Sequence, residues 1–95
     1  MDVEVSMGDS RTTWREQIEI EMAKHGETWA DVVACTLTDA ELDQRFYADI
    51  GGTNGTPFTL WTTGRVYFPA CYESNEWAAS VPRHPCTATT EPVGG

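Results

Sequence analysis

The segment Pro57–Pro82 constrains the fold most, because its large apolar side chains alternate with other residues in three separate runs. The runs cover residues 58–63, 66–72 and 77–81. A repeat of two residues is typical of half-buried β-strands. The gaps at 63–64 and 73–75 are short enough for hairpin turns. The segment therefore predicts a three-stranded antiparallel meander.

Three helix-start signals precede this segment. Thr13 and Glu16 have capping-box spacing, and an apolar stripe follows at helical intervals until Gly26, which can end a helix. The stripe comprises Trp14, Ile18, Met22 and His25. Ile20 points away from the stripe, so an exposed Ile20 is a candidate contact residue.

Two shorter helices are expected next. Thr28 is a plausible N-cap with Asp31 in the first turn, and we interpret the run Val32–Leu37 as helix followed by turn, although its composition also suits a strand. The third helix has the clearest start, with a Thr38–Glu41 capping box and a Leu37–Leu42 hydrophobic staple. We expect this helix to continue to Phe46 and to end near Tyr47 or Ile50.

These elements predict an α+β fold in which two or three N-terminal helices pack on one face of a C-terminal three-stranded antiparallel meander. Residues 1–10 are expected to be a flexible tail, residues 11–86 one domain, and residues 87–95 a disordered tail. The chain has no run of 18 apolar residues and no apolar signal-peptide core, so neither a membrane span nor secretion is expected.

The alternation also predicts which way the strand side chains point. With Phe58, Leu60, Val66, Phe68 and Trp77 toward the helices, the residues Trp61, Tyr67 and Ala78 face outward. Tryptophan, tyrosine and arginine are frequent interface anchors. An open sheet face with Trp61, Arg65 and Tyr67 is therefore one candidate docking surface, unless a loop or the tail covers Trp61.

Charge is distributed unevenly along the chain. The formal net charge is −9, of which −8 falls in residues 1–49 and −1 in residues 50–95. The six basic residues form no run, which argues against nucleic-acid binding. An acidic surface instead attracts a basic partner and could present carboxylates in place of phosphates. The candidate docking carboxylates are Glu16, Glu19, Glu27, Asp31, Asp39, Glu41, Asp43 and Asp49. The competing interpretation is that these residues only solvate the surface.

No constellation of residues predicts catalysis, a metal or a cofactor. His84 and Cys86, with Cys71 and either His25 or Cys35, are the best candidate zinc ligands, but structural zinc sites normally show two close ligand pairs. The glycine-rich segment 51–55 precedes a strand and lacks the lysine of a phosphate-binding loop. We therefore predict no enzyme activity; a zinc-stabilised or redox domain is the less favoured alternative.

Four segments resemble a group of small acidic proteins encoded by bacteriophages and prophages. They are WTTGRVYFP at residues 61–69, SVPRHP at 80–85, TWADVV at 28–33 and TLTD at 36–39. The likeness covers residues 13–86 and carries no catalytic motif. It implies a phage product that acts in the cytoplasm of a bacterial host.

Small acidic phage proteins include anti-CRISPR and other anti-defence inhibitors, and by this association we expect an inhibitor that binds a host defence protein, such as a CRISPR effector complex. The alternative function is a phage interaction module in morphogenesis or host takeover.

Overall fold

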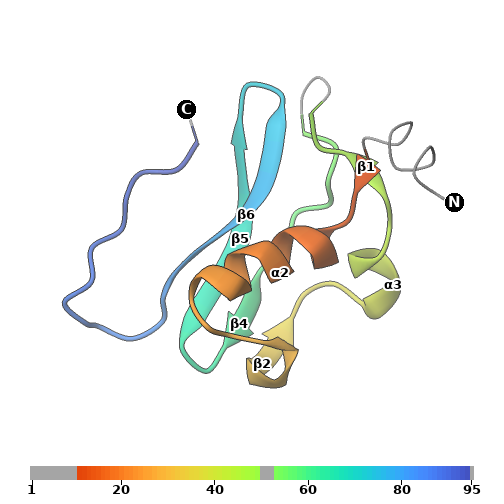
Figure 1. The fold of residues 1–95 in the computed structure, drawn as a ribbon. Helices are drawn as coiled ribbons and strands as arrows, with labels where there is room; N and C mark the ends of the chain where they lie inside the picture. The colour runs from red at the N-terminus through yellow and green to blue at the C-terminus, as the bar shows by residue number, and fades with distance from the viewer. Residues whose placement is uncertain (1–10, 50–52, 95) are drawn as a thin grey trace, which may run out of the picture.

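The computed structural model describes residues 11–49 and 53–94 and shows an α+β fold with two antiparallel sheets. The helical elements are α2 (Trp14–Lys24), a 3₁₀ turn η1 (Trp29–Asp31) and α3 (Asp39–Leu42). The larger sheet has the strand order β2 (Val32–Cys35), β4 (Leu60–Thr62), β5 (Arg65–Tyr72) and β6 (Asn75–Pro82). The smaller sheet pairs β1 (Arg11–Thr12) with β3 (Phe46–Tyr47). Figure 1 shows α2 crossing the larger sheet.

The predicted arrangement of N-terminal helices on a three-stranded meander is wrong. The larger sheet has a fourth strand, because the Val32–Cys35 run pairs with β4 instead of continuing as helix. The third predicted helix stops after Leu42, and Phe46 and Tyr47 pair with Thr12 and Arg11. Both errors concern short segments whose conformation is decided by a strand partner distant in sequence.

The predicted N-caps Thr28 and Thr38 are confirmed, and Thr13 forms one of the two hydrogen bonds of its predicted capping box. The Thr13 hydroxyl accepts a hydrogen bond from the N–H of Glu16, and Thr28 and Thr38 each form a complete capping box with Asp31 and Glu41. The Glu16 carboxylate accepts from the hydroxyl of Thr12, a contact that the sequence pattern did not predict. These caps satisfy N–H groups that the first turn of a helix leaves without partners.

The core lies between α2 and the larger sheet. The most deeply buried large side chains include Trp14, Ile18 and Met22 of α2 and Leu60 and Tyr67 of the sheet. The staple residues Leu37 and Leu42 join this cluster. Gly26 has a φ of 70°, the left-handed conformation that ends α2 where the sequence predicted.

The larger sheet has two unlike faces, which we call the covered face and the open face. The covered face packs against the α2 side of the molecule and contains Leu60, Thr62, Arg65, Tyr67, Ala78 and Ser80. The open face carries the residues that alternate with them, which include Ala34, Trp61, Val66, Phe68, Ala70, Tyr72, Asn75, Trp77, Ala79 and Val81. The described C-terminal residues 89–93 line a hollow with Trp77 and Ala79 of this face.

This arrangement corrects the predicted side-chain directions in β5 and β6. Tyr67 and Ala78 are buried against the helix side, whereas Val66, Phe68 and Trp77 lie on the opposite face, where they are half-buried. Leu60 points inward and Trp61 outward, as predicted. Beyond the sheet, residues 83–94 have no helix or strand, and the predicted N-terminal tail and Ile50 lie outside the described residues.

Candidate functional site

An exposed acidic surface on α2 and α3 contains several of the predicted docking residues. We call it the acidic face and define it by Glu16, Glu19, Ile20, Asp39 and Asp43. Arg15 holds the two helices together: its Nε lies 2.6 Å from Oδ1 of Asp43, and its Nη2 lies 3.4 Å from Oδ1 of Asp39. The hydrogen bond to Asp43 is the largest cause that raises the pKa of Arg15. Arg15 is therefore cationic at any physiological pH, and it offsets one of the surrounding negative charges.

Trp29 extends this contact to the 3₁₀ turn. The guanidinium carbon of Arg15 lies 5.1 Å from the centre of the Trp29 ring, and the indole Nε1 of Trp29 donates a 2.7 Å hydrogen bond to Glu19. Sequence reasoning missed Arg15 and Trp29 as organising residues. The spacing of Arg15 and Glu19, one helical turn apart, was the available signal.

Ile20 is exposed on α2, next to Glu19 in the sequence. Its side chain is 55% exposed, as predicted, and Glu16 lies one turn before it on the same side of α2. The Asp39 side chain is 95% exposed. Apolar side chains ringed by charge are common at the centre of protein-binding surfaces, where the apolar group is buried on docking.

Other predicted docking carboxylates serve the fold. Asp31 and Glu41 accept hydrogen bonds from the backbone N–H groups of Thr28 and Thr38 in the two capping boxes. Asp49 is exposed beyond β3, away from any described contact with the acidic face. Glu27 is half-buried and faces the sheet.

Glu27 belongs to a polar cluster on the covered face. Tyr67 donates a 2.6 Å hydrogen bond to Oε1 of Glu27, and the Thr62 hydroxyl lies 2.9 Å from both carboxylate oxygens. Burial is the main cause that raises the pKa of Tyr67, and the neighbouring Glu27 carboxylate raises it further. The Tyr67 side chain is fully buried, so it is not the exposed docking residue predicted from the sequence.

A second polar cluster connects the end of α2 to β6. The Ser80 hydroxyl donates to Oε2 of Glu21 at 2.8 Å and accepts from Nε of Arg65 at 2.8 Å. His25 Nε2 lies 3.1 Å from the same Glu21 oxygen. Arg65 was predicted to face outward, but these contacts place its guanidinium on the covered side. In the described residues every buried side-chain nitrogen and oxygen has a hydrogen-bond partner, so both clusters are complete as internal contacts.

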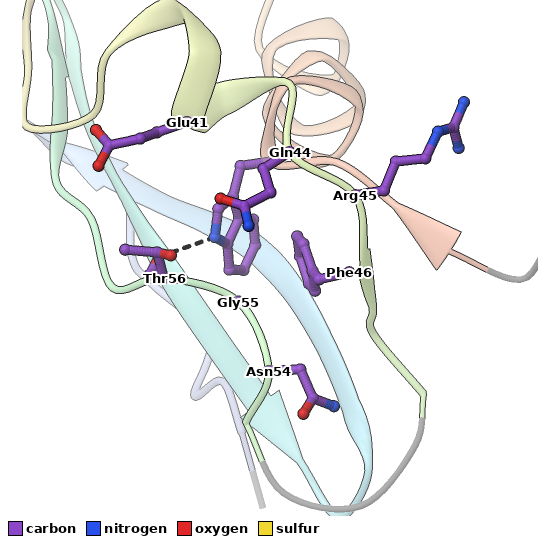
Figure 2. Close-up of a pocket in the computed structure, with 8 residues that line it drawn as sticks. Glu41, Gln44, Arg45, Phe46, Asn54, Gly55 and Thr56 are labelled. Atoms are coloured by element: carbon purple, nitrogen blue, oxygen red, sulfur yellow. Dashed lines mark hydrogen bonds between the residues drawn. The ribbon is translucent and has the colours of Figure 1, made fainter.

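One hollow borders the Ser80 cluster, and a smaller one lies at the Trp14 indole. The larger, about 390 Å³, lies between the end of α2, the β6 residues Trp77 and Ala79, and the C-terminal segment 89–93. The smaller, about 90 Å³, is lined by Trp14 together with residues labelled in Figure 2, among them Gln44, Phe46 and Asn54. Ligand sites typically have volumes of about 300–1,000 Å³, so the smaller hollow is below this range.

The smaller hollow is shaped by the loop that enters β4. The indole Nε1 of Trp14 donates a 2.9 Å hydrogen bond to the carbonyl of Thr56, drawn in Figure 2. A Cβ atom added to Gly55 would lie 2.6 Å from the Trp14 ring, so only glycine fits there. The backbone N–H groups of Asn54 and Gly55 donate to the buried Glu76 carboxylate at 2.7 and 3.0 Å.

The described residues contain no group of three or more His, Cys, Asp or Glu side chains that could hold a metal ion. Cys35, Cys71 and Cys86 are free thiols. Among residues 11–49 and 53–94, no helix is long and apolar enough to cross a bilayer.

Comparison with known proteins provides no further assignment: no protein-family model, curated protein or solved structure matches this chain.

Proposed function

We propose that the protein is a phage-encoded inhibitor of a bacterial defence system that binds a host defence protein stoichiometrically in the bacterial cytoplasm. A CRISPR effector complex is the partner class to test first. The observation that carries the docking part of this proposal is the Arg15 contact with Asp39 and Asp43. It supports a surface on which carboxylates from two helices lie close together, and α2 also carries the exposed Ile20. The phage origin rests on the sequence resemblance.

The chemistry of this surface favours a basic partner. Nucleic-acid-binding grooves of defence proteins carry arginine and lysine side chains that pair with phosphates, and carboxylates can occupy the same positions. Attraction of this kind mainly raises the association rate and is screened by salt over about 8 Å at physiological ionic strength. The inhibitor would therefore compete with nucleic acid for its target without binding nucleic acid itself.

A plating assay tests this function. Expression of the protein in bacteria with an active CRISPR system should restore plaque formation by a targeted phage. The double variant Glu16→Gln/Glu19→Gln should restore it less, because it removes two charges from the acidic face while each glutamine can still accept the hydrogen bonds from Thr12 and Trp29. The matched control is Glu73→Gln/Glu91→Gln, which removes two exposed charges from the sheet half of the chain. If both double variants restored plaque formation equally, the acidic face would not be the docking surface.

The open face favours a second function, a phage interaction module in morphogenesis or host takeover. Of the predicted aromatic docking residues, Trp61 lies on this face, beside Val66 in the neighbouring strand. A module of this kind would leave plaque formation under CRISPR immunity unchanged. The variant Trp61→Gln would then weaken capture of its partner, and Glu16→Gln/Glu19→Gln would not.

A further inference from the structure

The loop that enters β4 contains an asparagine followed directly by a glycine, Asn54 and Gly55, both labelled in Figure 2. Asparagine side chains are chemically labile, and this dipeptide is the most reactive context for them. Glycine has no Cβ atom, so its backbone nitrogen can approach the side-chain carbonyl of the preceding asparagine without obstruction. The other asparagine, Asn75, is followed by Glu76, whose side chain obstructs the same approach. Asn54 is therefore the candidate site of spontaneous deamidation.

The fold requires the glycine of this dipeptide. A Cβ atom added to Gly55 would lie 2.6 Å from the Trp14 ring. The ring has no room to move away, because it is 1% exposed and its Nε1 is bonded to the carbonyl of Thr56 at 2.9 Å. The reactive dipeptide is thus a consequence of how the core packs around Trp14.

Two hydrogen bonds hold the reacting groups apart in the folded loop. Deamidation begins when the nitrogen of Gly55 attacks Cγ of Asn54. In the structure the Gly55 N–H donates to Oε1 of Glu76 at 3.0 Å, and Nδ2 of Asn54 donates to the carbonyl of Tyr47 at 2.9 Å. A carboxylate is a weak base toward an amide N–H, so its hydrogen bond stabilises the protonated nitrogen instead of activating it. The closed loop therefore protects Asn54.

Glu76 is held in place by contacts of its own. Its residue is 6% exposed, and its backbone N–H donates to the carbonyl of Ala48 at 2.7 Å. It is paired with Cys71 across the β5–β6 hairpin, and its Oε2 also accepts from the N–H of Asn54 at 2.7 Å. The nitrogen of Gly55 becomes reactive only when the loop opens locally and leaves this carboxylate.

We propose that Asn54 is a self-modification site whose reaction is controlled by Glu76. In the open loop the nitrogen of Gly55 forms a bond to Cγ of Asn54. The bond from Cγ to Nδ2 then breaks, and Nδ2 leaves as ammonia with the proton that the Gly55 nitrogen gives up. Water opens the resulting succinimide ring at either carbonyl and produces aspartate or isoaspartate at position 54. Water is the only co-reactant.

The modification prevents the loop from closing in its original form. The new carboxylate replaces the donor group that faces the carbonyl of Tyr47, so two acceptors oppose each other there. It also adds a negative charge beside the Glu76 carboxylate, which repels it. The modified loop is expected to remain detached from Glu76. The proposal is independent of the inhibitor function, because its test requires no target protein.

Peptide mapping by mass spectrometry measures the reaction in the full chain during incubation at mildly alkaline pH. A synthetic peptide of residues 53–58, incubated in parallel, gives the rate without the fold. Asn54 should react about tenfold to a hundredfold more slowly in the protein, because local opening limits the reaction. Asn75 is the internal control and should keep its amide. An Asn54 that stays intact beyond this range would overturn the proposal, and so would a rate equal to that of the peptide.

The variant Glu76→Gln tests the control by the carboxylate. Glutamine keeps one acceptor oxygen and places an NH₂ group at the other position, so one of the two backbone N–H groups loses its partner. Deamidation of Asn54 should become about fivefold faster, which corresponds to the loss of one hydrogen bond. Glu73→Gln is the matched control, because it makes the same change at an exposed residue of the same hairpin, and it should react like the wild type. Equal rates in the two variants would show that Glu76 does not control the reaction.

Hydrogen exchange provides a test in the wild-type protein, independent of how Glu76→Gln folds. Exchange of the Gly55 N–H needs the same opening as deamidation, since both require loss of its bond to Glu76. The factor by which the fold slows this exchange should therefore match the factor by which it slows deamidation of Asn54. An unprotected Gly55 N–H in a protein whose Asn54 reacts slowly would reject control by this contact.

Discussion

The two faces of the larger sheet reverse the usual relation between polarity and burial. The covered face carries Thr62, Tyr67 and Ser80, all buried and hydrogen-bonded to glutamates. The open face carries Trp61, Phe68 and Trp77, all half-exposed. A buried polar group costs little stability when all its hydrogen bonds are made. A large exposed apolar patch often marks a site of interaction with another molecule. In this sheet, the availability of a hydrogen-bond partner predicts which side chains are buried better than side-chain polarity does.

The largest difference between the faces should appear in alanine variants of adjacent residues. Tyr67→Ala removes a fully buried ring and one donor to Glu27, and it should lower the free energy of unfolding by about 3–5 kcal/mol. Phe68→Ala removes a half-buried ring and should cost about 1 kcal/mol. Urea denaturation at micromolar protein measures both. Equal losses would mean that the two faces are equally buried.

A smaller difference is expected for polar side chains in β6. Ser80→Ala removes the hydroxyl between Glu21 and Arg65, and it should cost about 1–3 kcal/mol because both charged groups lose a partner. Val81→Thr introduces a hydroxyl of similar volume on the open face and should change stability by about 0.5 kcal/mol. Thermal unfolding compares the two variants. If Val81→Thr costs as much as Ser80→Ala, the open face is already covered.

Alkaline pH should affect the covered face through Tyr67. The pKa of Tyr67 is raised in the folded state above its ordinary value of 10.0. Its contribution to stability is therefore complete below pH 10 and falls as pH rises above that value, by at most about 1.4 kcal/mol per pH unit. Tyr67→Phe should flatten this part of the stability profile, measured by urea unfolding between pH 8 and 11. Tyr72→Phe, which removes an exposed phenol, is the matched control. If Tyr67→Phe had the same dependence of stability on pH as the wild type, the Tyr67 phenol would be exposed to water.

The smallest effect is expected for carboxylates outside the sheet. Asp43→Asn weakens an exposed ion pair with Arg15 and should cost less than about 1 kcal/mol, with a smaller cost at high salt. Glu27→Gln on the covered face should cost more and respond less to salt, since two hydroxyl groups bond this carboxylate. Unfolding at low and high ionic strength separates the two. A larger loss in Asp43→Asn would assign the acidic face a structural role.

The helix caps could be predicted from the sequence because their partners lie within three residues. Thr28 and Thr38 cap as predicted, and Thr13 forms the hydroxyl half of its predicted capping box. The directions of β5 and β6 could not be predicted in the same way. The more apolar set of alternating residues, including Phe68 and Trp77, was expected to face the core, and it faces away.

The reason for this reversal is the sequence separation of the polar partners. Tyr67 bonds to Glu27, and Ser80 bonds to Glu21. Hydropathy treats each of these residues as a surface residue, and local spacing gives no sign of the pairing. The acidic face shows the same limit, because the carboxylates were identified in advance but their connection through Arg15 required the positions of α2 and α3.

The Glu76 carboxylate accepts hydrogen bonds from the backbone N–H groups of Asn54 and Gly55. It therefore occupies the position that a bound anion takes in an anion-binding loop. Here the bound group, the Glu76 carboxylate, and the loop that binds it belong to the same polypeptide. The carboxylate is delivered at the effective concentration that closure of the chain provides, and free anions compete poorly with it. Order in the loop is thus linked thermodynamically to the pairing of β5 with β6, and the loop, the indole that it covers and the hairpin should open as one cooperative unit.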